Sequence, residues 1–240
     1  MVNDIQGLAA TGKLGSSKLP RVVLLFVIVD VVLCLAYVIN YWAGQPFVKI
    51  SVLLDLDSED SFASWYSSIQ LFCIFVLYAI FVFHDFRKNR ETYALALLPV
   101  VFLLMSIDES FQLHERIGSR SDVLLSSGTR AGTIFQETGI WMFLLGIPFI
   151  IFFTVLVFLV RKQLSERPSS VLRLAAGMAI LLTGALGVEV LSNFAENGLF
   201  IAEVVLEEGL EMLGASLILW SAYEVAVEKV YAGFSRSLVV

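Results

Sequence analysis

The sequence predicts an all-α fold: a polytopic membrane bundle of six transmembrane helices with both termini in the cytoplasm. The chain of 240 residues is 58% hydrophobic and only 16% charged, whereas a soluble domain carries about 25% charged residues. Its apolar runs reach the length of about 20 residues that a helix needs to cross a bilayer. Lys and Arg gather in alternate connections between these runs, as in multi-pass proteins.

Six apolar runs give the predicted spans, at about 20–43, 62–84, 92–115, 131–160, 170–193 and 199–225. Glycine and proline mark the connections, at Gly44, Pro46, Gly118, Gly128 and Pro168. Residues 1–19, which are rich in Gly, Ser and Ala, are expected to form a flexible cytoplasmic tail. Residues 20–228 then form the transmembrane domain, and residues 229–240 form a cytoplasmic C-terminal tail.

Loop charge predicts the orientation. Of the 16 Lys and Arg residues, twelve fall on the side of the two termini and four, Lys49, Arg116, Arg120 and Arg130, on the other. The positive-inside rule therefore places both termini in the cytoplasm. The net charge of −6 and the lack of a basic stripe argue against nucleic acid as a partner. The expected partner is the lipid bilayer, and a homo-oligomer or a larger membrane complex stays open.

Six acidic residues lie deep inside the apolar runs: Asp108, Glu109, Glu189, Glu207, Glu208 and Glu211. A carboxylate at mid-membrane costs about 2.5–3.5 kcal/mol on insertion scales. These groups must therefore be protonated, hydrated, hydrogen-bonded to one another, or in contact with a cation. This cost makes them the first candidates for a functional site.

The distances of these acids from the cytoplasmic ends of their helices place them at a similar depth in the membrane. Asp108 and Glu189 each follow fifteen uncharged residues of an outward-running helix, which places them roughly 22 Å from the cytoplasmic boundary at about 1.5 Å per residue. Glu211 precedes twelve uncharged residues of an inward-running helix, which gives roughly 18–20 Å. Three helices should thus present carboxylates near the outer surface, where close approach is expected at Gly132, Gly139, Gly184, Gly187, Gly209 and Gly214.

Helical spacing predicts which acids share a face. Three stripes follow the spacing i, i+4, i+7 or i, i+4, i+8: Asp108, Gln112 and Glu115; Glu189, Asn193 and Glu196; and Glu203, Glu207 and Glu211. Carboxylates with one imidazole are ligands for a proton or a divalent metal ion, the only cofactor that the sequence suggests. The candidate metal ligands are Asp108, Glu109, His114, Glu115, Glu137, Glu189, Glu207, Glu208 and Glu211. The alternative is structural, with His114 and Glu115 at a wet helix end and Arg116, Arg120 or Arg130 neutralising the acids.

Two further acidic features stand apart. Asp30 lies alone in the middle of the first span, where it either bonds to a Ser, Tyr or Asn of a neighbouring helix or takes part in ion passage. The run DLDSED at 55–60 is interpreted as a solvated loop in which Asp60 or Ser61 caps the second helix. A calcium loop is disfavoured because its sixth position is Asp60 instead of Gly.

Two segments carry a resemblance. SIDESFQLHE at 106–115 and EEGLEMLG at 207–214 resemble the S-x-D-E-x4-H-E and E-E-x2-E-M-x-G patterns of a group of bacterial six-helix membrane proteins without a known activity. The resemblance implies a location in the bacterial inner membrane. Ceramidase-like hydrolases do not match, because the two histidines, His84 and His114, are expected on opposite sides of the membrane. Di-iron carboxylate bundles are similar in outline, because the third to sixth predicted helices each carry a Glu, but the Glu-x-x-His that such bundles use is absent from the sequence.

Three functions fit these observations. The first is an outward-facing cation site, for a proton or a divalent metal, in a small transporter, a channel or a metal-dependent subunit of a membrane complex. The second is an intramembrane metalloenzyme that acts on a lipid-borne or apolar substrate. The third is a non-catalytic structural subunit of a membrane assembly. The sequence leaves open whether the protein is an enzyme.

Overall fold

The computed structural model describes residues 19–58, 60–86, 93–124, 140–164, 167–192, 194 and 200–237, and every regular element within them is helical. In chain order the helices are α2 (Arg21–Trp42), α3 (Val48–Leu53), α4 (Phe62–Phe86), α5 (Tyr93–Phe111), α6 (Leu113–Ser121), η1 (Asp122–Leu124), η2 (Met142–Gly146), α7 (Ile147–Gln163), α8 (Pro168–Leu182), η3 (Thr183–Val188), α9 (Glu189–Ser192) and α10 (Phe200–Ser237). The short elements η2 and η3 are π-helical turns, continuous with α7 and α8 respectively.

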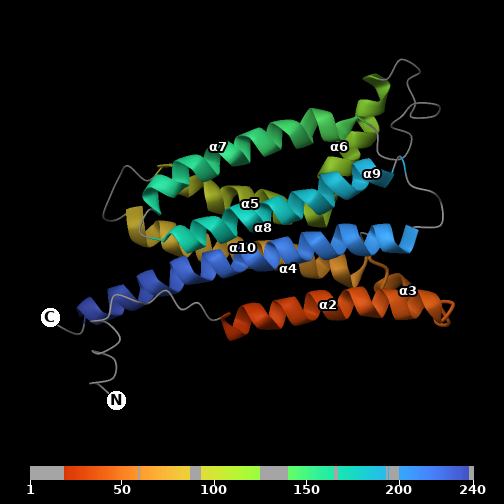
Figure 1. The fold of residues 1–240 in the computed structure, drawn as a ribbon, viewed down its shortest axis with the longest axis horizontal. Coiled ribbons are helices and arrows are strands. Elements are labelled where there is room, and N and C mark those ends of the chain that lie inside the picture. The colour runs from red at the N-terminus through yellow and green to blue at the C-terminus, as the bar shows by residue number, and fades with distance from the viewer. Residues whose placement is uncertain are drawn as a thin grey trace.

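Six helices of the described chain are long and apolar enough to cross a membrane, which confirms the predicted fold class. They are Arg21–Trp42, Phe62–His84, Ala94–Phe111, Met142–Gln163, Pro168–Ser192 and Phe200–Val227. The long helices lie side by side in one bundle, and α2 begins at the same end of the bundle at which α10 ends (Figure 1). An even number of crossings requires this arrangement.

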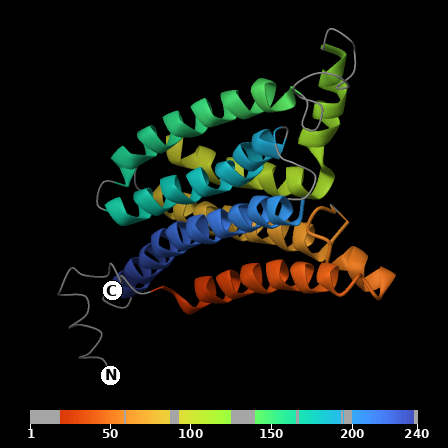
Figure 2. The same cartoon turned by 45° about the vertical axis from the view of Figure 1, so that its right-hand side comes forward.

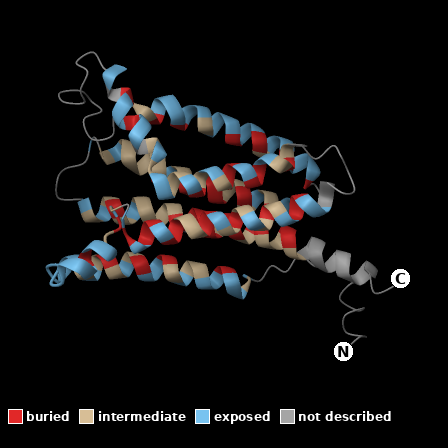
Figure 3. Ribbon diagram, turned by 180° about the vertical axis from the view of Figure 1, so that it is seen from behind, coloured by how far each residue is buried: buried red, intermediate tan, exposed pale blue. Residues whose placement is uncertain are grey.

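The outer helices present apolar surface. On α2, Leu25, Val32 and Ile39 are each more than half exposed, and on α7 the same holds for Ile151 and Phe158. Figure 3 shows these exposed faces on the outside of the bundle. Apolar surface of this extent is unfavourable in water, and lipid chains cover it without cost.

The core lies along α10 and α4. Helix α10 packs against α8, α4 and α2, and its buried residues concentrate in its middle part, between Met212 and Ala226 (Figure 3). Ile218 and Ala222 of α10 are fully buried in one apolar cluster together with Tyr78, Phe102 and Leu174. This packing fixes the position of α10 relative to its neighbours, and α10 carries three of the predicted site residues.

Glycines bring α8 and α10 into backbone contact. A Cβ atom at Gly214 would lie 2.5 Å from the backbone nitrogen of Leu181, and one at Gly177 would lie 2.7 Å from the carbonyl oxygen of Gly214. Further along, a Cβ at Gly184 would lie 2.6 Å from the carbonyl oxygen of Glu207. A side chain cannot occupy these positions without moving the helices apart.

Two predicted spans differ in extent from the structure. The third, predicted as a continuous helix over 92–115, ends at Phe111, because Gln112 adopts a left-handed conformation with φ +53°. Helix α6 then leaves α5 at a steep angle (Figure 2). Helix α10 continues to Ser237, beyond the membrane span Phe200–Val227 and into the segment 229–240, whose assignment as a cytoplasmic tail stays a prediction. The predicted start of the fourth span, 131–139, lies outside the described residues.

Candidate functional site

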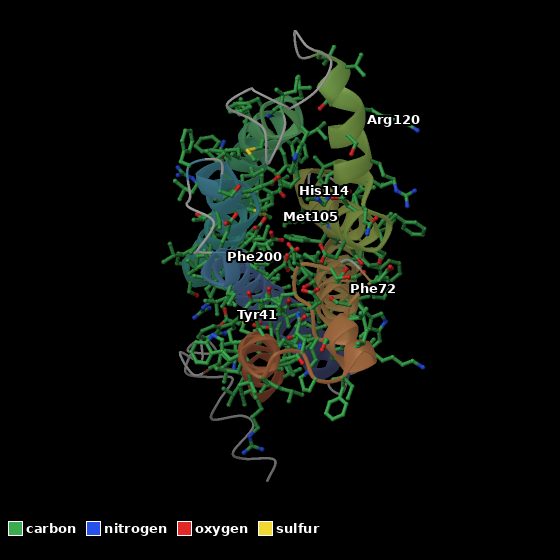
Figure 4. The ribbon with its side chains drawn as sticks, turned by 90° about the vertical axis from the view of Figure 1, so that its right-hand side faces the viewer. Tyr41, Phe72, Met105, His114, Arg120 and Phe200 are labelled. Carbon is green, nitrogen blue, oxygen red and sulfur yellow. The ribbon has the colours of Figure 1, made fainter. Side chains whose placement is uncertain are left out.

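A cavity of about 710 Å³ lies at the end of the bundle where α6, α9 and the beginning of α10 meet. Figure 4 looks into this end of the molecule and shows His114 and Met105 near the centre of the bundle. The residues that line the cavity come from all the long helices except α2, from α6 and α9, from the two π-helical turns, from Trp141 just before η2 and from the connection before α4. Small-molecule sites in proteins usually measure about 300–1,000 Å³.

Acidic residues dominate the polar lining. Seven of them line the cavity: Asp57, Asp108, Glu109, Glu189, Glu207, Glu208 and Glu211. No Lys or Arg is found among the described residues that line it. Because seven carboxyl groups and no described Lys or Arg line it, the cavity has a negative electrostatic potential where its acids are ionised.

The inner wall of the cavity is apolar. Met105 lies three residues before Asp108 on α5, and Leu181 and Leu182 lie about two turns before Glu189, so each lies farther from this end of the bundle than the acid that follows it on its own helix. Phe149 of α7 and Leu71 of α4 complete this wall. One cavity thus combines an acidic outer part with a hydrocarbon-lined inner part.

Asp108 shapes the corner between α5 and α6. One of its carboxylate oxygens, Oδ1, accepts the backbone N–H of His114 at 2.9 Å, and the other, Oδ2, lies 2.8 Å from the imidazole Nδ1 of His114. The first bond caps α6 near its N-terminus, in place of the Gln112 side chain. The second holds the imidazole ring in one orientation at the edge of the cavity, as carboxylates do for functional histidines.

Trp141 joins His114 to Glu189. The His114 and Trp141 rings are 5.1 Å apart between centroids, and the indole Nε1 of Trp141 donates a hydrogen bond to Glu189 Oε1 at 3.3 Å. A Cβ at Gly118 would lie 3.0 Å from the Trp141 ring, so α6 also packs against it closely. Through Trp141, which directly precedes η2, these contacts connect α5, α6 and α9 around the cavity mouth.

Both π-helical turns lie in the cavity wall. Leu145 and Gly146 of η2, and Ala185 and Leu186 of η3, line the cavity. A Cβ at Gly146 would lie 3.0 Å from Leu186, so the two turns face each other closely. A π-helical turn inserts an extra residue into a helix, and such turns occur frequently at functional sites.

The predicted ligands are placed as follows. Asp108, Glu109, His114, Glu189, Glu207, Glu208 and Glu211 all line this cavity. The break at Gln112 removes the predicted single stripe through Asp108 and Glu115. Glu137, Asn193, Glu196 and the side chain of Glu115 lie outside the described residues.

The arginine alternative finds no support in the described part of the chain. Arg116 and Arg120 are exposed and form no ion pair with another described residue, and Figure 4 shows Arg120 on the outer side of α6. Arg130 is outside the described residues. In the same part of the chain, no group of three His, Cys, Asp or Glu side chains has a geometry that could hold a metal ion.

Two residues of the site do not follow from the sequence patterns. Asp57, interpreted as part of a solvated loop, lines the cavity. Trp141 lies among apolar residues at the start of its span, and no spacing rule distinguishes it from a membrane-interface tryptophan. The proposed cap at Ser61 is confirmed, since its Oγ accepts the backbone N–H of Ser64 at 3.2 Å.

The bundle and its acidic cavity define an integral membrane protein with six transmembrane helices. The chain matches the family described as "Domain of unknown function (DUF8692)" over residues 23–227, and it belongs to that family. No curated protein and no solved structure is significantly similar to it.

Proposed function

We propose that this chain is a small transporter that binds an organic cation, with an amine and an apolar part, in its acidic cavity. The observation that carries the proposal is the division of one cavity of about 710 Å³ into an acidic lining and an apolar inner wall. Cation binding from the outer side of the membrane was one function expected from the sequence. The volume and the mixed acidic and apolar lining of the cavity favour an organic cation over a bare metal ion.

Each part of the cavity suits one part of such a ligand. Glu207, Glu208 and Glu211, within one and a half turns of α10, attract an ammonium group. The Trp141 ring at the mouth can contact a cation through its face, a contact worth about 0.5–2 kcal/mol. Phe149 and Leu181 accept the hydrocarbon part and exclude water from it.

A bare divalent metal ion fits the described residues less well. Oxygen ligands surround such ions at about 2.0–2.6 Å, a far smaller space than this cavity. In the described chain the acidic side chains also do not converge in threes on a point that a metal could occupy. We therefore favour an organic cation over the metal cofactor that the sequence suggested.

The proposal is tested by calorimetry on the full-length protein in lipid nanodiscs. The probes are phenethylamine, a primary amine with one ring, and phenethyl alcohol, which has nearly the same shape but no charge. We expect the amine to bind with a Kd below about 1 mM and at least about tenfold more tightly than the alcohol. Mg²⁺ and Zn²⁺ are titrated in parallel, and metal content is measured on the same preparation.

The outcomes separate the alternatives. Equal affinity for the amine and the alcohol, or no binding of the amine, contradicts the organic-cation site. Stoichiometric Zn²⁺ or Mg²⁺ that competes with the amine would instead support the metal site. Where the amine binds, uptake of radiolabelled phenethylamine into proteoliposomes tests the transport step.

A second candidate function is an intramembrane hydrolase, which the Asp108–His114 pair favours. A carboxylate at 2.8 Å from Nδ1 orients an imidazole for general-base catalysis, and the apolar inner wall could accept the chain of a lipid-borne substrate. Lipid extracts of cells that overproduce the protein are compared by mass spectrometry with those of a His114→Gln variant. A product that depends on His114 would favour this function over transport.

The location proposed for the chain is the bacterial inner membrane, with both termini in the cytoplasm. The support is the bias of twelve to four in Lys and Arg between the two sides. A green fluorescent protein fused after Val240 is expected to fluoresce, because that protein matures in the cytoplasm and not after export. An alkaline phosphatase fusion at the same point should be inactive, and the reverse pair of results would invert the orientation.

A further inference from the structure

Asp30 lies buried in the middle of α2, on the opposite side of α10 from most of the cavity lining. Only 3% of its surface is exposed, although the residue lies nine positions into a span of 22. The side chains that reach it come from α4 and α10. Asp30 is therefore a carboxyl group in the interior of a membrane-spanning bundle, in a position separate from the acidic cavity.

Three side chains surround the Asp30 carboxyl group. Its Oδ1 lies 2.7 Å from the Tyr66 hydroxyl, and the Ser216 hydroxyl donates to its Oδ2 at 2.7 Å. The Nε2 of Gln70 lies 3.5 Å from Oδ1, which is too long for a strong hydrogen bond. These contacts confirm the expected bonding of Asp30 to Ser or Tyr residues on neighbouring helices.

The orientation of the Gln70 amide is fixed by its other partners. Its Nε2 lies 3.2 Å from the carbonyl oxygen of Met212 and 2.8 Å from Ser216 Oγ. Because a carbonyl oxygen only accepts hydrogen bonds, the atom facing Met212 must be the nitrogen. Both hydrogens of Nε2 are then used, and the single hydrogen of the Ser216 hydroxyl is left to be donated to Asp30.

The hydrogens around Tyr66 do not match its acceptors. Its hydroxyl carries one hydrogen, yet two acceptors lie within hydrogen-bond distance: Asp30 Oδ1 at 2.7 Å and the carbonyl oxygen of Phe26 at 2.9 Å. With a proton on Asp30, the carboxylic acid donates to the Tyr66 oxygen and Tyr66 donates to Phe26, so both short contacts become hydrogen bonds. Without that proton, Tyr66 donates to Asp30 only.

Both hydrogen-bond patterns leave the carboxyl group satisfied. In the ionised state its oxygens accept from Tyr66 and Ser216, and in the protonated state it donates to one and accepts from the other. The two states differ by one proton and by the rotation of one hydroxyl group. A buried acid with an alternative pattern of this kind can gain and lose a proton without repacking of the helices.

The charged surroundings of Asp30 are sparse. The titratable groups that face it are Tyr66 on α4 and Cys34, one turn further along α2, with Glu208 of α10 beyond Cys34. Among the described residues, no Lys or Arg contacts Asp30. An ionised carboxylate in this setting has hydroxyl groups as partners and no cation, an arrangement that is costly inside a membrane.

We propose that Asp30 is a proton-binding site, which gives the protein a second cation site besides the acidic cavity. The two sites meet at Gln70. Its Oε1 is buried and has no hydrogen-bond partner among the described residues. Gln70 also lines a small cavity of about 10 Å³ together with Ser67, Glu109 and Glu211. A proton on Asp30 is thus bound one side chain away from carboxylates that line the main cavity.

Infrared spectroscopy of the full-length protein in lipid nanodiscs tests this site. We expect the C=O stretching band of a protonated carboxylic acid at neutral pH that is missing in Asp30→Asn. Asparagine reproduces the protonated pattern, because its amide donates to Tyr66 and its oxygen accepts from Ser216, so the variant should fold. Tyr66→Phe provides a second reading, since it removes the acceptor and should shift the band to higher frequency.

Two buried serines of α10 give a matched control. Ser216→Ala removes a donor to Asp30 and should shift the band, whereas Ser221→Ala, whose hydroxyl bonds to Tyr78 and to the Ser170 carbonyl, should leave it in place. If Asp30→Asn removes only a carboxylate band, or no band, between about pH 5 and pH 9, the proton site is absent. No cation is added in this measurement, so its failure leaves the cavity proposal untouched.

Discussion

The Gly214→Ala variant is expected to unfold at a temperature roughly 10 °C below that of the native protein. The new Cβ would lie 2.5 Å from the Leu181 nitrogen and 2.6 Å from the Gly177 oxygen, whereas carbon atoms in contact are about 3.5–4.0 Å from their neighbours. Both atoms belong to the backbone, so no side chain can rotate to relieve the overlap. Helix α8 must move away from α10 by about 1 Å, and such overpacking costs about 1–3 kcal/mol or more.

The displacement should also reach the cavity. Gly184, two turns along from Gly177, contacts the Glu207 carbonyl oxygen, so the same pair of helices positions Glu207 and Glu211. Gly214→Ala should therefore weaken the binding of phenethylamine as well as lower the midpoint of thermal unfolding. The midpoint is measured in detergent at one fixed heating rate, because irreversible unfolding makes it depend on that rate.

Two other glycines provide controls in the same helices. A Cβ at Gly187 would meet Thr183 at 3.5 Å, and one at Gly209 would meet Cys34 at 3.4 Å, both ordinary contacts. Alanine is favoured over glycine in a helix by up to about 1 kcal/mol, so Gly187→Ala and Gly209→Ala should keep or raise the midpoint. A Gly214→Ala protein as stable as these two would show that α8 and α10 do not touch as described.

Close helix contacts at glycines could be predicted from the sequence only in part. Gly184 and Gly214 were among the six expected at close helix contacts, and the structure places both there. Gly209 makes an ordinary contact with Cys34 of α2, whereas Gly187 meets only Thr183 of its own helix. Gly132 and Gly139 lie outside the described residues, and Gly177 was not among the six. A small residue in an apolar run reads the same whether it faces a helix or lipid, so sequence alone cannot separate the two cases.

The transmembrane spans, and the common depth of the acidic residues of different helices, were easier to predict than the glycine contacts. Both follow from distance along a helix. A run of about 20 apolar residues fixes a crossing, and the rise of about 1.5 Å per residue fixes the depth of Asp108, Glu189 and Glu211. The corner at Gln112 could not be predicted in this way. It depends on Asp108 bonding to His114 across the turn, a contact that no periodic pattern contains.

The double variant Glu207→Gln/Glu211→Gln is expected to bind phenethylamine at least about tenfold more weakly than the native protein. Both side chains line the cavity from one face of α10, and a charge-assisted hydrogen bond to an ammonium contributes about 1.5–3 kcal/mol. Glutamine keeps the size of the side chain and removes the charge. The affinity for phenethyl alcohol should not change, because that ligand depends on the apolar wall.

Stability should respond in the opposite direction to affinity. Glu203, Glu207 and Glu211 follow one another at intervals of four residues on α10. Like charges at this spacing destabilise a helix. Removing two of them should keep or raise the thermal midpoint while binding is lost. A variant that lost both binding and stability would point to a folding role for these residues.

Glu203→Gln separates a local site from general attraction by negative charge. Glu203 lies on the same face of α10, one turn nearer its N-terminus, and is not among the residues that line the cavity. Its replacement changes the net charge by the same unit as each single Glu207→Gln or Glu211→Gln change, so the affinity for phenethylamine should fall by less than about twofold. The comparison is made at an ionic strength of about 0.15 M, where the Debye length is about 8 Å. If Glu203→Gln and Glu211→Gln lower the affinity for phenethylamine equally, the amine is attracted to the negative surface of the protein and is not bound among these carboxylates.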